Sequence, residues 1–184
     1  DSLGSSQLIS PGALGLMTDG EAIAHAENSP ATHPSLLHGV QLWVALPAAV
    51  RAVDPAWQHH ADPPVLQTKG VRATVIMGKL DGAKSPGVAH SPIIGSDVEV
   101  EEGADARLPL EPDFEYAVLT MAGAVEVDGV MLAPGTMLYL GCGRNDLRLT
   151  AESCAQLLLG GGEPFEEGID MWRKFVARKA DDIA

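Results

Sequence analysis

Short apolar stretches that alternate with polar or small residues, and that end at glycine or proline, constrain this fold most. The 184 residues include 20 Gly and 13 Pro, many of them between such stretches. Residues 38–46 are the clearest case, because Val40, Leu42, Val44 and Leu46 alternate with other residues before Pro47. A period of two between turn residues is typical of strands. The chain is therefore predicted to be an all-β sandwich or barrel.

The same pattern predicts a series of strands and one tight hairpin. The hairpin is expected at Asp128-Gly129. Residues 48–69 contain three prolines, so we predict a linker with one helical turn. Residues 166–176 are expected to be extended or irregular, with a helix beginning near Lys179. The other predicted strands span residues 7–10, 14–17, 23–27, 71–77, 97–100, 116–121, 124–127, 131–132, 137–140, 147–149 and 155–159.

Charge and cysteine content exclude several classes of protein. The formal net charge is −13, which repels a polyphosphate backbone and argues against direct nucleic-acid binding. No apolar run is long enough to span a membrane. Cys142 and Cys154 have no CxxC spacing, so we expect two buried thiols in a reducing, cytoplasmic setting. Cys142 lies between two glycines, which leaves an exposed thiol as the alternative.

An internal sequence repeat indicates two related domains. Residues 7–17 and 129–139 both follow the order strand, Pro-Gly, strand. A repeated β unit implies a repeated domain. At the corresponding distance, the second copy offers Asn145, Asp146 and Arg148, which do not form a metal-ligand set.

His25 and Glu27 are the candidate metal ligands of this chain. Residues two apart on a strand point to the same side, so the imidazole and the carboxylate can reach one cation. Two donors do not complete a metal site, because even a facial triad needs three. On spacing alone, the alternative is a surface histidine beside a surface glutamate.

The remaining histidines have simpler interpretations. His38 precedes a predicted core strand and is expected to be structural. His59 and His60 fall in the predicted linker and are expected to be a solvated pair. His33 and His90 adjoin proline or Ser-Pro and are expected in loops. The triple glycine at 160–162 opens no recognisable helix, which argues against a phosphate-binding loop.

Taken in order, these motifs resemble the pirin family. Residues 1–4, 11–12, 17–20 and 24–27 are similar to the second half of that family's first cupin domain. Residues 37–47 resemble its most recognisable strand. Residues 90–92, 158–164 and 171–176 are similar to its second domain and tail. The chain departs from the family at Asp19-Gly20-Glu21-Ala22, and at Gly168, Arg173, Lys174 and Lys179 in the tail.

The resemblance implies a tandem cupin: two β-barrel domains, here with an incomplete first barrel and a short C-terminal helix. We expect the first domain and linker at residues 1–65 and the second at 66–184. It implies one metal held by three histidines and a glutamate, with His25 and Glu27 as two of them. The other two histidines would come from an H-x-H motif upstream of Asp1. Fe(II) is the expected metal, with Mn, Ni and Cu as alternatives.

The resemblance also implies a function. The expected activity is cleavage of a quercetin-like flavonol with dioxygen, in which Glu27 also accepts the substrate's hydroxyl proton as a general base. The alternative is a metal-dependent regulatory module that binds a partner protein without turnover. The full-length protein is expected to be a monomer. The 184-residue chain is expected to be marginally stable, or to associate through an exposed sheet edge.

Overall fold

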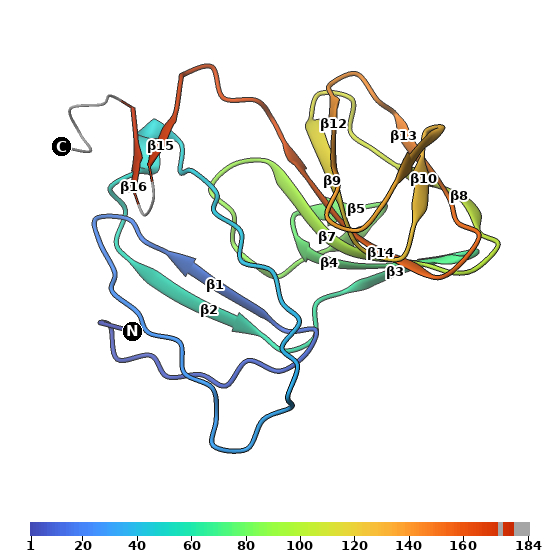
Figure 1. The fold of residues 1–184 in the computed structure, drawn as a ribbon. Coiled ribbons are helices and arrows are strands. Elements are labelled where there is room, and N and C mark those ends of the chain that lie inside the picture. Colours follow the sequence, from blue (N-terminus) through green and yellow to red (C-terminus); the bar gives the residue numbers. More distant parts are fainter. Residues whose placement is uncertain (173–174, 179–184) are drawn as a thin grey trace. The chain divides into compact units, whose positions relative to one another are not determined.

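A computed structural model describes residues 1–172 and 175–178, which form an all-β chain with one short 3₁₀ turn, η1 (Ala48–Val50). The all-β prediction is confirmed. The strands are β1 (Leu14–Thr18), β2 (Ala56–His60), β3 (Val65–Thr68), β4 (Val71–Met77), β5 (Lys79–Leu80), β6 (Ala83–Lys84), β7 (Ile93–Val100), β8 (Asp105–Pro109), β9 (Glu115–Ala122), β10 (Val125–Val127), β11 (Val130–Leu132), β12 (Met137–Gly141), β13 (Asp146–Thr150), β14 (Ala155–Gly162), β15 (Asp170–Trp172) and β16 (Phe175–Ala177) (Figure 1).

The chain divides into two compact units. Unit 1 comprises Asp1–Leu8, Met17–Trp57 and the described residues from Phe165 onward. Unit 2 comprises Ile9–Leu16 and Gln58–Pro164. β1 and β2, which carry the boundaries between the units, pair in a two-stranded sheet. The domain division predicted at residues 65/66 stays a prediction.

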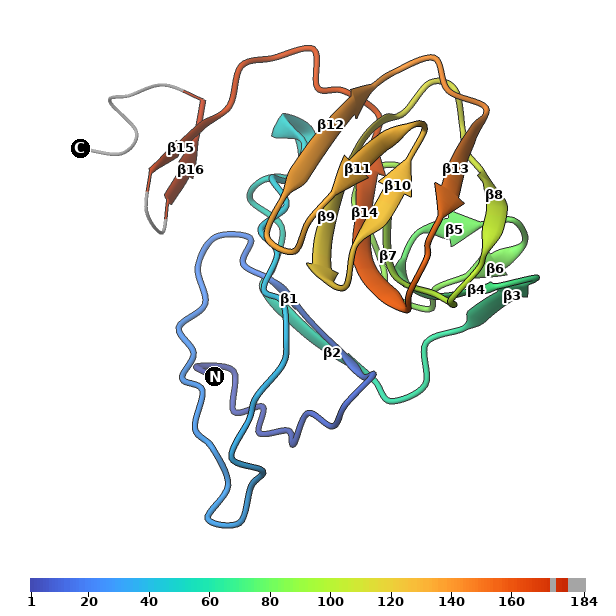
Figure 2. The ribbon, with the colours of Figure 1, turned by 45° about the vertical axis from the view of Figure 1, so that its right-hand side comes forward.

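Unit 2 is a β-sandwich of the cupin type. Its larger sheet has the strand order β12-β9-β14-β7-β4-β3, and its smaller sheet has the order β11-β10-β13-β8. The registered pairs are antiparallel, as in Leu157↔Val98 between β14 and β7. Figure 2 shows the two sheets curling around a shared interior. Because strands distant in sequence are neighbours here, pairing depends on the tertiary fold.

The interior of unit 2 is built from aliphatic side chains of both sheets. Inward positions alternate with outward ones, as the burial of β4 and β9 shows. Burying one such side chain contributes about 1.5–3 kcal/mol, so this set dominates the stability of the unit. The largest fully enclosed members are Val71, Val75, Val98, Val100, Leu157, Leu159 and Val118 from the larger sheet, and Leu108, Val125, Val127, Leu147 and Leu149 from the smaller one.

Two tight hairpins fix the ends of short strands. The predicted Asp128-Gly129 turn is confirmed, with φ of 47° and 85°, and it joins β10 to β11. A second turn, Asp81-Gly82, has φ of 41° and 87° and joins β5 to β6. Both are the Asp-Gly sequence that a turn with two positive φ angles favours. The second hairpin was not among the predicted elements.

Three predicted strands are wrong. Residues 7–10, 23–27 and 38–46 are irregular, although 14–17 and the predicted strands after residue 70 are confirmed. The alternation of 38–46 is compatible with a strand, but a strand also needs a hydrogen-bonded neighbour. No strand of the described chain pairs with these segments.

The predicted linker at 48–69 is also only partly correct. Its one helical turn is confirmed by η1, but β2 and β3 lie within the same range. β3 pairs along β4, from Val65↔Thr74 to Thr68↔Val71. The neighbouring strand supplies the backbone partners that local sequence does not reveal.

The described residues of the tail, 166–172 and 175–176, are irregular or extended, as predicted. β15 and β16 pair with each other. Arg178 forms an ion pair with Glu167 at 3.2 Å, lies 5.8 Å from the ring centre of Phe165 and donates to the Leu46 carbonyl. The helix predicted near Lys179 falls outside the described residues.

Both cysteines are exposed, so the prediction of buried thiols is wrong. Cys142 lies in the turn after β12, between Gly141 and Gly143, which both have positive φ. The exposed alternative is the correct one for this residue. Cys154 precedes β14, before inward-facing positions begin. No helix in the described part of the chain is long and apolar enough to cross a membrane.

Candidate functional site

The segment that carries His25 and Glu27 leaves β1 through a turn fixed by Gly20. Gly20 has φ of 55°, and a Cβ at this position would lie 1.8 Å from the Val53 carbonyl oxygen. The next amide, of Glu21, donates to that same oxygen at 3.2 Å. Only glycine allows the backbone this close, so Gly20 sets where the segment begins.

A second contact lies directly before His25. The Ser2 amide donates to the Ala24 carbonyl at 2.7 Å, and the Ala24 amide donates to the Ser2 hydroxyl at 3.0 Å. This reciprocal pair holds the backbone of residue 24 from both sides. Ser2 and Val53 were not predicted, because nothing in the sequence links either residue to the segment around His25. The glycine at position 20 was the one sequence signal that could have located the start of this segment.

His25 and Glu27 are both exposed and lie on irregular backbone. Their alignment is therefore not set by the pleat of a strand, contrary to the prediction from their spacing. Within the described residues, neither side chain has a hydrogen bond or ion pair, and no group of three His, Cys, Asp or Glu gathers to hold a metal ion. The assignment of His25 and Glu27 as ligands stays a prediction.

The other histidines differ from expectation in two places. His59 and His60 are partly buried on β2, so the solvated linker pair is wrong. His60 Nε2 lies 3.4 Å from Gln58 Oε1, which accepts the Val88 amide at 3.0 Å. His38 is exposed, because the strand that it was expected to precede does not form.

The two histidines that were predicted to lie in loops do so. His33 and His90 are exposed and lie outside strands, as expected for loop residues. His33 Nδ1 lies 2.7 Å from the Pro34 carbonyl oxygen.

In unit 2, the residues at the distance corresponding to the ligand pair make structural contacts. The backbone carbonyl of Asn145 accepts a hydrogen bond from the Leu110 amide at 2.8 Å. Asp146 pairs with Arg107. Arg148 binds both carboxylate oxygens of Asp105 at 2.8 Å, and this hydrogen-bonded guanidinium lowers the pKa of Asp105. These contacts join β8 to β13 on the exposed side of the sheet.

The interior of unit 2 is lined by aliphatic side chains and has few polar atoms that could bind a metal. Among the described residues of unit 2, the buried polar side chains are Ser85, Ser96 and Thr120. Ser85 and Ser96 donate to the backbone carbonyls of Ile76 and Thr74.

Comparisons with known proteins match this architecture. Residues 95–184 match the model described as pirin C-terminal cupin domain, and residues 1–44 match the model described as pirin. The "Putative quercetin 2,3-dioxygenase PA1205" of Pseudomonas aeruginosa is 41% identical over 184 residues, covering 100% of this chain and 58% of that protein. A "Pirin-like protein" of Caulobacter vibrioides is 36% identical, covering 100% of this chain and 64% of that protein.

A solved structure is similar over nearly the whole chain. The crystal structure titled quercetin 2,3-dioxygenase from Acinetobacter baumannii is 40% identical, with a TM-score of 0.93. The match covers 99% of this chain and 60% of that one. The chain thus spans about three fifths of the length of the relatives that it matches.

Proposed function

Because this chain belongs to the pirin family of two-domain cupin proteins, we propose that it is part of a metal-dependent dioxygenase that acts on quercetin-like flavonols. The observation that carries this proposal is the similarity over the whole chain to proteins named as quercetin 2,3-dioxygenases. Since the match covers only part of those proteins, the activity is proposed for the whole protein rather than for this chain alone.

The residues present fit such a metal in type but not in number. Imidazole and carboxylate are donors that suit Fe(II), and also Mn, Ni and Cu. His25 and Glu27 supply one of each, and no further donor joins them within the described chain. A mononuclear site therefore needs donors beyond those that the described chain brings together, from solvent or from other protein segments.

Glu27 has a second proposed role that its own chemistry supports. A flavonol must lose a hydroxyl proton before it can react with dioxygen as an enolate, and a carboxylate beside that hydroxyl can accept the proton. Glu27 is exposed and makes no hydrogen bond with described residues, so its carboxylate is free to do so. His25 is proposed as a neutral imidazole donor.

The test measures metal binding and turnover separately. The full-length protein is loaded with Fe(II), Mn, Ni or Cu, metal binding is measured by calorimetry, and quercetin absorbance is followed under air. We expect His25→Ala and Glu27→Gln to weaken metal binding at least about tenfold, as loss of a ligand does. His33→Ala and Glu21→Gln, which change other exposed residues of unit 1, are the controls and should bind metal normally.

Constant quercetin absorbance with every metal, at full occupancy, would rule out the enzyme. Equal metal binding by His25→Ala and His33→Ala would rule out His25 as a ligand. The two results are independent, so a protein that binds metal without turnover is distinguishable from one that binds none.

A non-enzymatic regulator is the second candidate. Two observations favour it: the net charge of −13, which suits a basic partner protein, and a set of exposed apolar side chains in unit 1, of which Leu36 and Leu37 are 81% and 91% exposed. We expect such a protein to retain a partner in a pull-down only when metal is bound. Retention that is the same with and without metal would contradict this function.

A further inference from the structure

A small pocket lies within unit 2. It is a hollow partly open to solvent, lined by the β5–β6 hairpin and the segment that joins β8 to β9, and its volume is about 170 Å³. Pockets for drug-sized ligands are larger, roughly 300–1,000 Å³. The pocket therefore fits a small metabolite rather than a flavonol.

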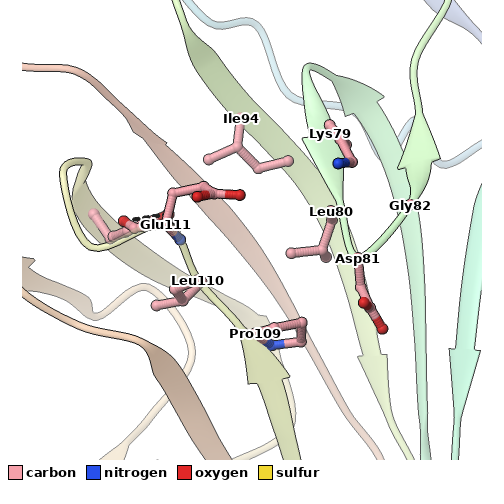
Figure 3. Close-up of a pocket in the computed structure, with 9 residues that line it drawn as sticks. Lys79, Leu80, Asp81, Gly82, Ile94, Pro109, Leu110 and Glu111 are labelled. Atoms are coloured by element: carbon pink, nitrogen blue, oxygen red, sulfur yellow. Dashed lines mark hydrogen bonds between the residues drawn. The ribbon is translucent and has the colours of Figure 1, made fainter.

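Two opposite charges face this space. Lys79 lies on β5 and Glu111 lies in the segment between β8 and β9, and both line the pocket (Figure 3). Neither side chain forms an ion pair with the residues that the structure describes. A cation and an anion held apart across a pocket are complementary to a ligand that carries both charges.

Part of the pocket's lining is apolar. Leu80, Ile94 and Leu110 line the pocket and are only 4%, 5% and 8% exposed. Apolar side chains near a charge reduce screening by water, which strengthens its attraction for an opposite charge. They also offer a surface on which a short apolar side chain of a ligand can be buried.

The backbone positions of both charged residues are fixed before any ligand arrives. The Tyr116 hydroxyl accepts the Glu111 amide at 2.8 Å and donates to the Glu111 carbonyl at 3.2 Å. Lys79 pairs in register with Lys84, next to the Asp81-Gly82 turn. Such preorganisation lowers the entropy that binding must remove.

We propose that this pocket binds a small zwitterion of the α-amino-acid type with an apolar side chain. The ligand's ammonium group lies against Glu111 and its carboxylate against Lys79, while its side chain packs on Leu80 and Ile94. Asp81 is the second carboxylate of the lining and points away from Glu111 in Figure 3. It leaves the lining with two negative charges against one positive, which disfavours simple anions.

The test compares three ligands that share one apolar side chain and differ in their charged groups. Free L-leucine, leucinamide and 4-methylpentanoate are titrated separately into ¹⁵N-labelled protein, and the amide signals of Gly82, Leu110 and Glu111 are followed. We expect saturable shifts with leucine. Leucinamide lacks the carboxylate and 4-methylpentanoate lacks the ammonium, so each should bind about tenfold more weakly.

Matched variants identify the partners of each charge. Lys79→Gln should weaken leucine binding but leave leucinamide unchanged, and Glu111→Gln should do the same for 4-methylpentanoate. Lys84→Gln and Asp113→Asn, which change exposed residues beside the pocket but outside its lining, are the controls. All four changes are at exposed side chains, and the dispersion of each amide spectrum shows that the variant is folded.

Three results would overturn the proposal. Equal binding of 4-methylpentanoate and leucine would make the pocket a simple anion site, and equal binding of leucinamide would make it a cation site. Absence of shifts up to the solubility limit of leucine would mean that the pocket has no such ligand. None of these results bears on metal binding or quercetin turnover, so this proposal and the proposed function fail separately.

Discussion

The hydroxyl oxygen of Tyr116 lies 2.8 Å from the backbone nitrogen of Glu111 and 3.2 Å from its carbonyl oxygen. One phenol thus pairs with both polar backbone groups of a residue five positions earlier. The ring of Tyr116 is buried in the core of unit 2, and this burial raises the pKa of its hydroxyl. The contact therefore connects the turn after β8 to the core of unit 2.

Tyr116→Phe should destabilise unit 2 by about 1–2 kcal/mol, because it leaves the Glu111 amide without its partner. Urea denaturation followed by circular dichroism measures the loss. The control is Tyr139→Phe, whose hydroxyl binds Glu115 at 2.8 Å on an exposed side chain and should cost less than about 0.5 kcal/mol. Equal losses of unfolding free energy in the two variants would show that the contact with Glu111 contributes no more to stability than the exposed contact with Glu115.

The Arg148–Asp105 pair should make stability depend on pH in acid. The two hydrogen bonds from Arg148 lower the folded-state pKa of Asp105 below its ordinary value. A depressed pKa contributes stability that is present above the unfolded value and is lost as the pH falls through the folded value. Wild-type stability should therefore fall below about pH 4, and Asp105→Asn should show a shallower fall.

Both side chains of this pair are exposed, so the effect is modest. Urea midpoints between neutral pH and strong acid measure it. Asp113→Asn removes a carboxylate that has no ion pair in the described structure and serves as the control. An Asp105→Asn curve parallel to that of wild type would contradict the contribution of Asp105.

Gly20→Ala should disrupt the start of the His25 segment. The new methyl carbon would lie 1.8 Å from the Val53 carbonyl oxygen, so backbone must move. Gly12→Ala is the matched control, because Gly12 has φ of 82° with nothing near its missing Cβ. The control isolates the cost of a positive φ, about 1 kcal/mol.

We expect Gly20→Ala to cost clearly more than Gly12→Ala in thermal unfolding, and to speed proteolysis within residues 21–46. Similar melting temperatures and cleavage rates for the two variants would mean that the Val53 contact does not hold this segment.

The segment at residues 36–44 should promote self-association of this chain. Its apolar side chains are exposed, and no Asp, Glu, Lys or Arg occurs between residues 28 and 50. In a chain of net charge −13, an uncharged apolar segment is a place where two copies meet without like-charge repulsion. Sedimentation velocity over a range of protein concentrations should show a shift to dimers or larger species.

Val44→Lys should weaken this association, because it places a charge within the segment. Val88→Lys is the control, since Val88 in unit 2 is exposed to a similar extent, 57% against 55%. A single monomeric species at all concentrations would rule the association out, and equal effects of the two variants would place it elsewhere.

Local chemistry determined much of unit 2 from the sequence alone. Alternating aliphatic residues identified its main strands, and the Asp128-Gly129 pair identified a hairpin, because both signals act between neighbouring residues. The same local logic missed β3, whose backbone partners come from β4. It also predicted a strand at 38–46, where the pattern is present but no neighbour pairs with it in the described chain.

For the candidate sites, the sequence determined residue types and their spacing, and the tertiary structure determined what surrounds them. His25 and Glu27 were recognisable as donors two residues apart, but only the structure shows that no third donor joins them among the described residues. Lys79 and Glu111 carry no signal in the sequence, since they are far apart along the chain. They face one pocket because the β5–β6 hairpin and the end of β8 meet, and such encounters depend on long-range packing rather than on local pattern.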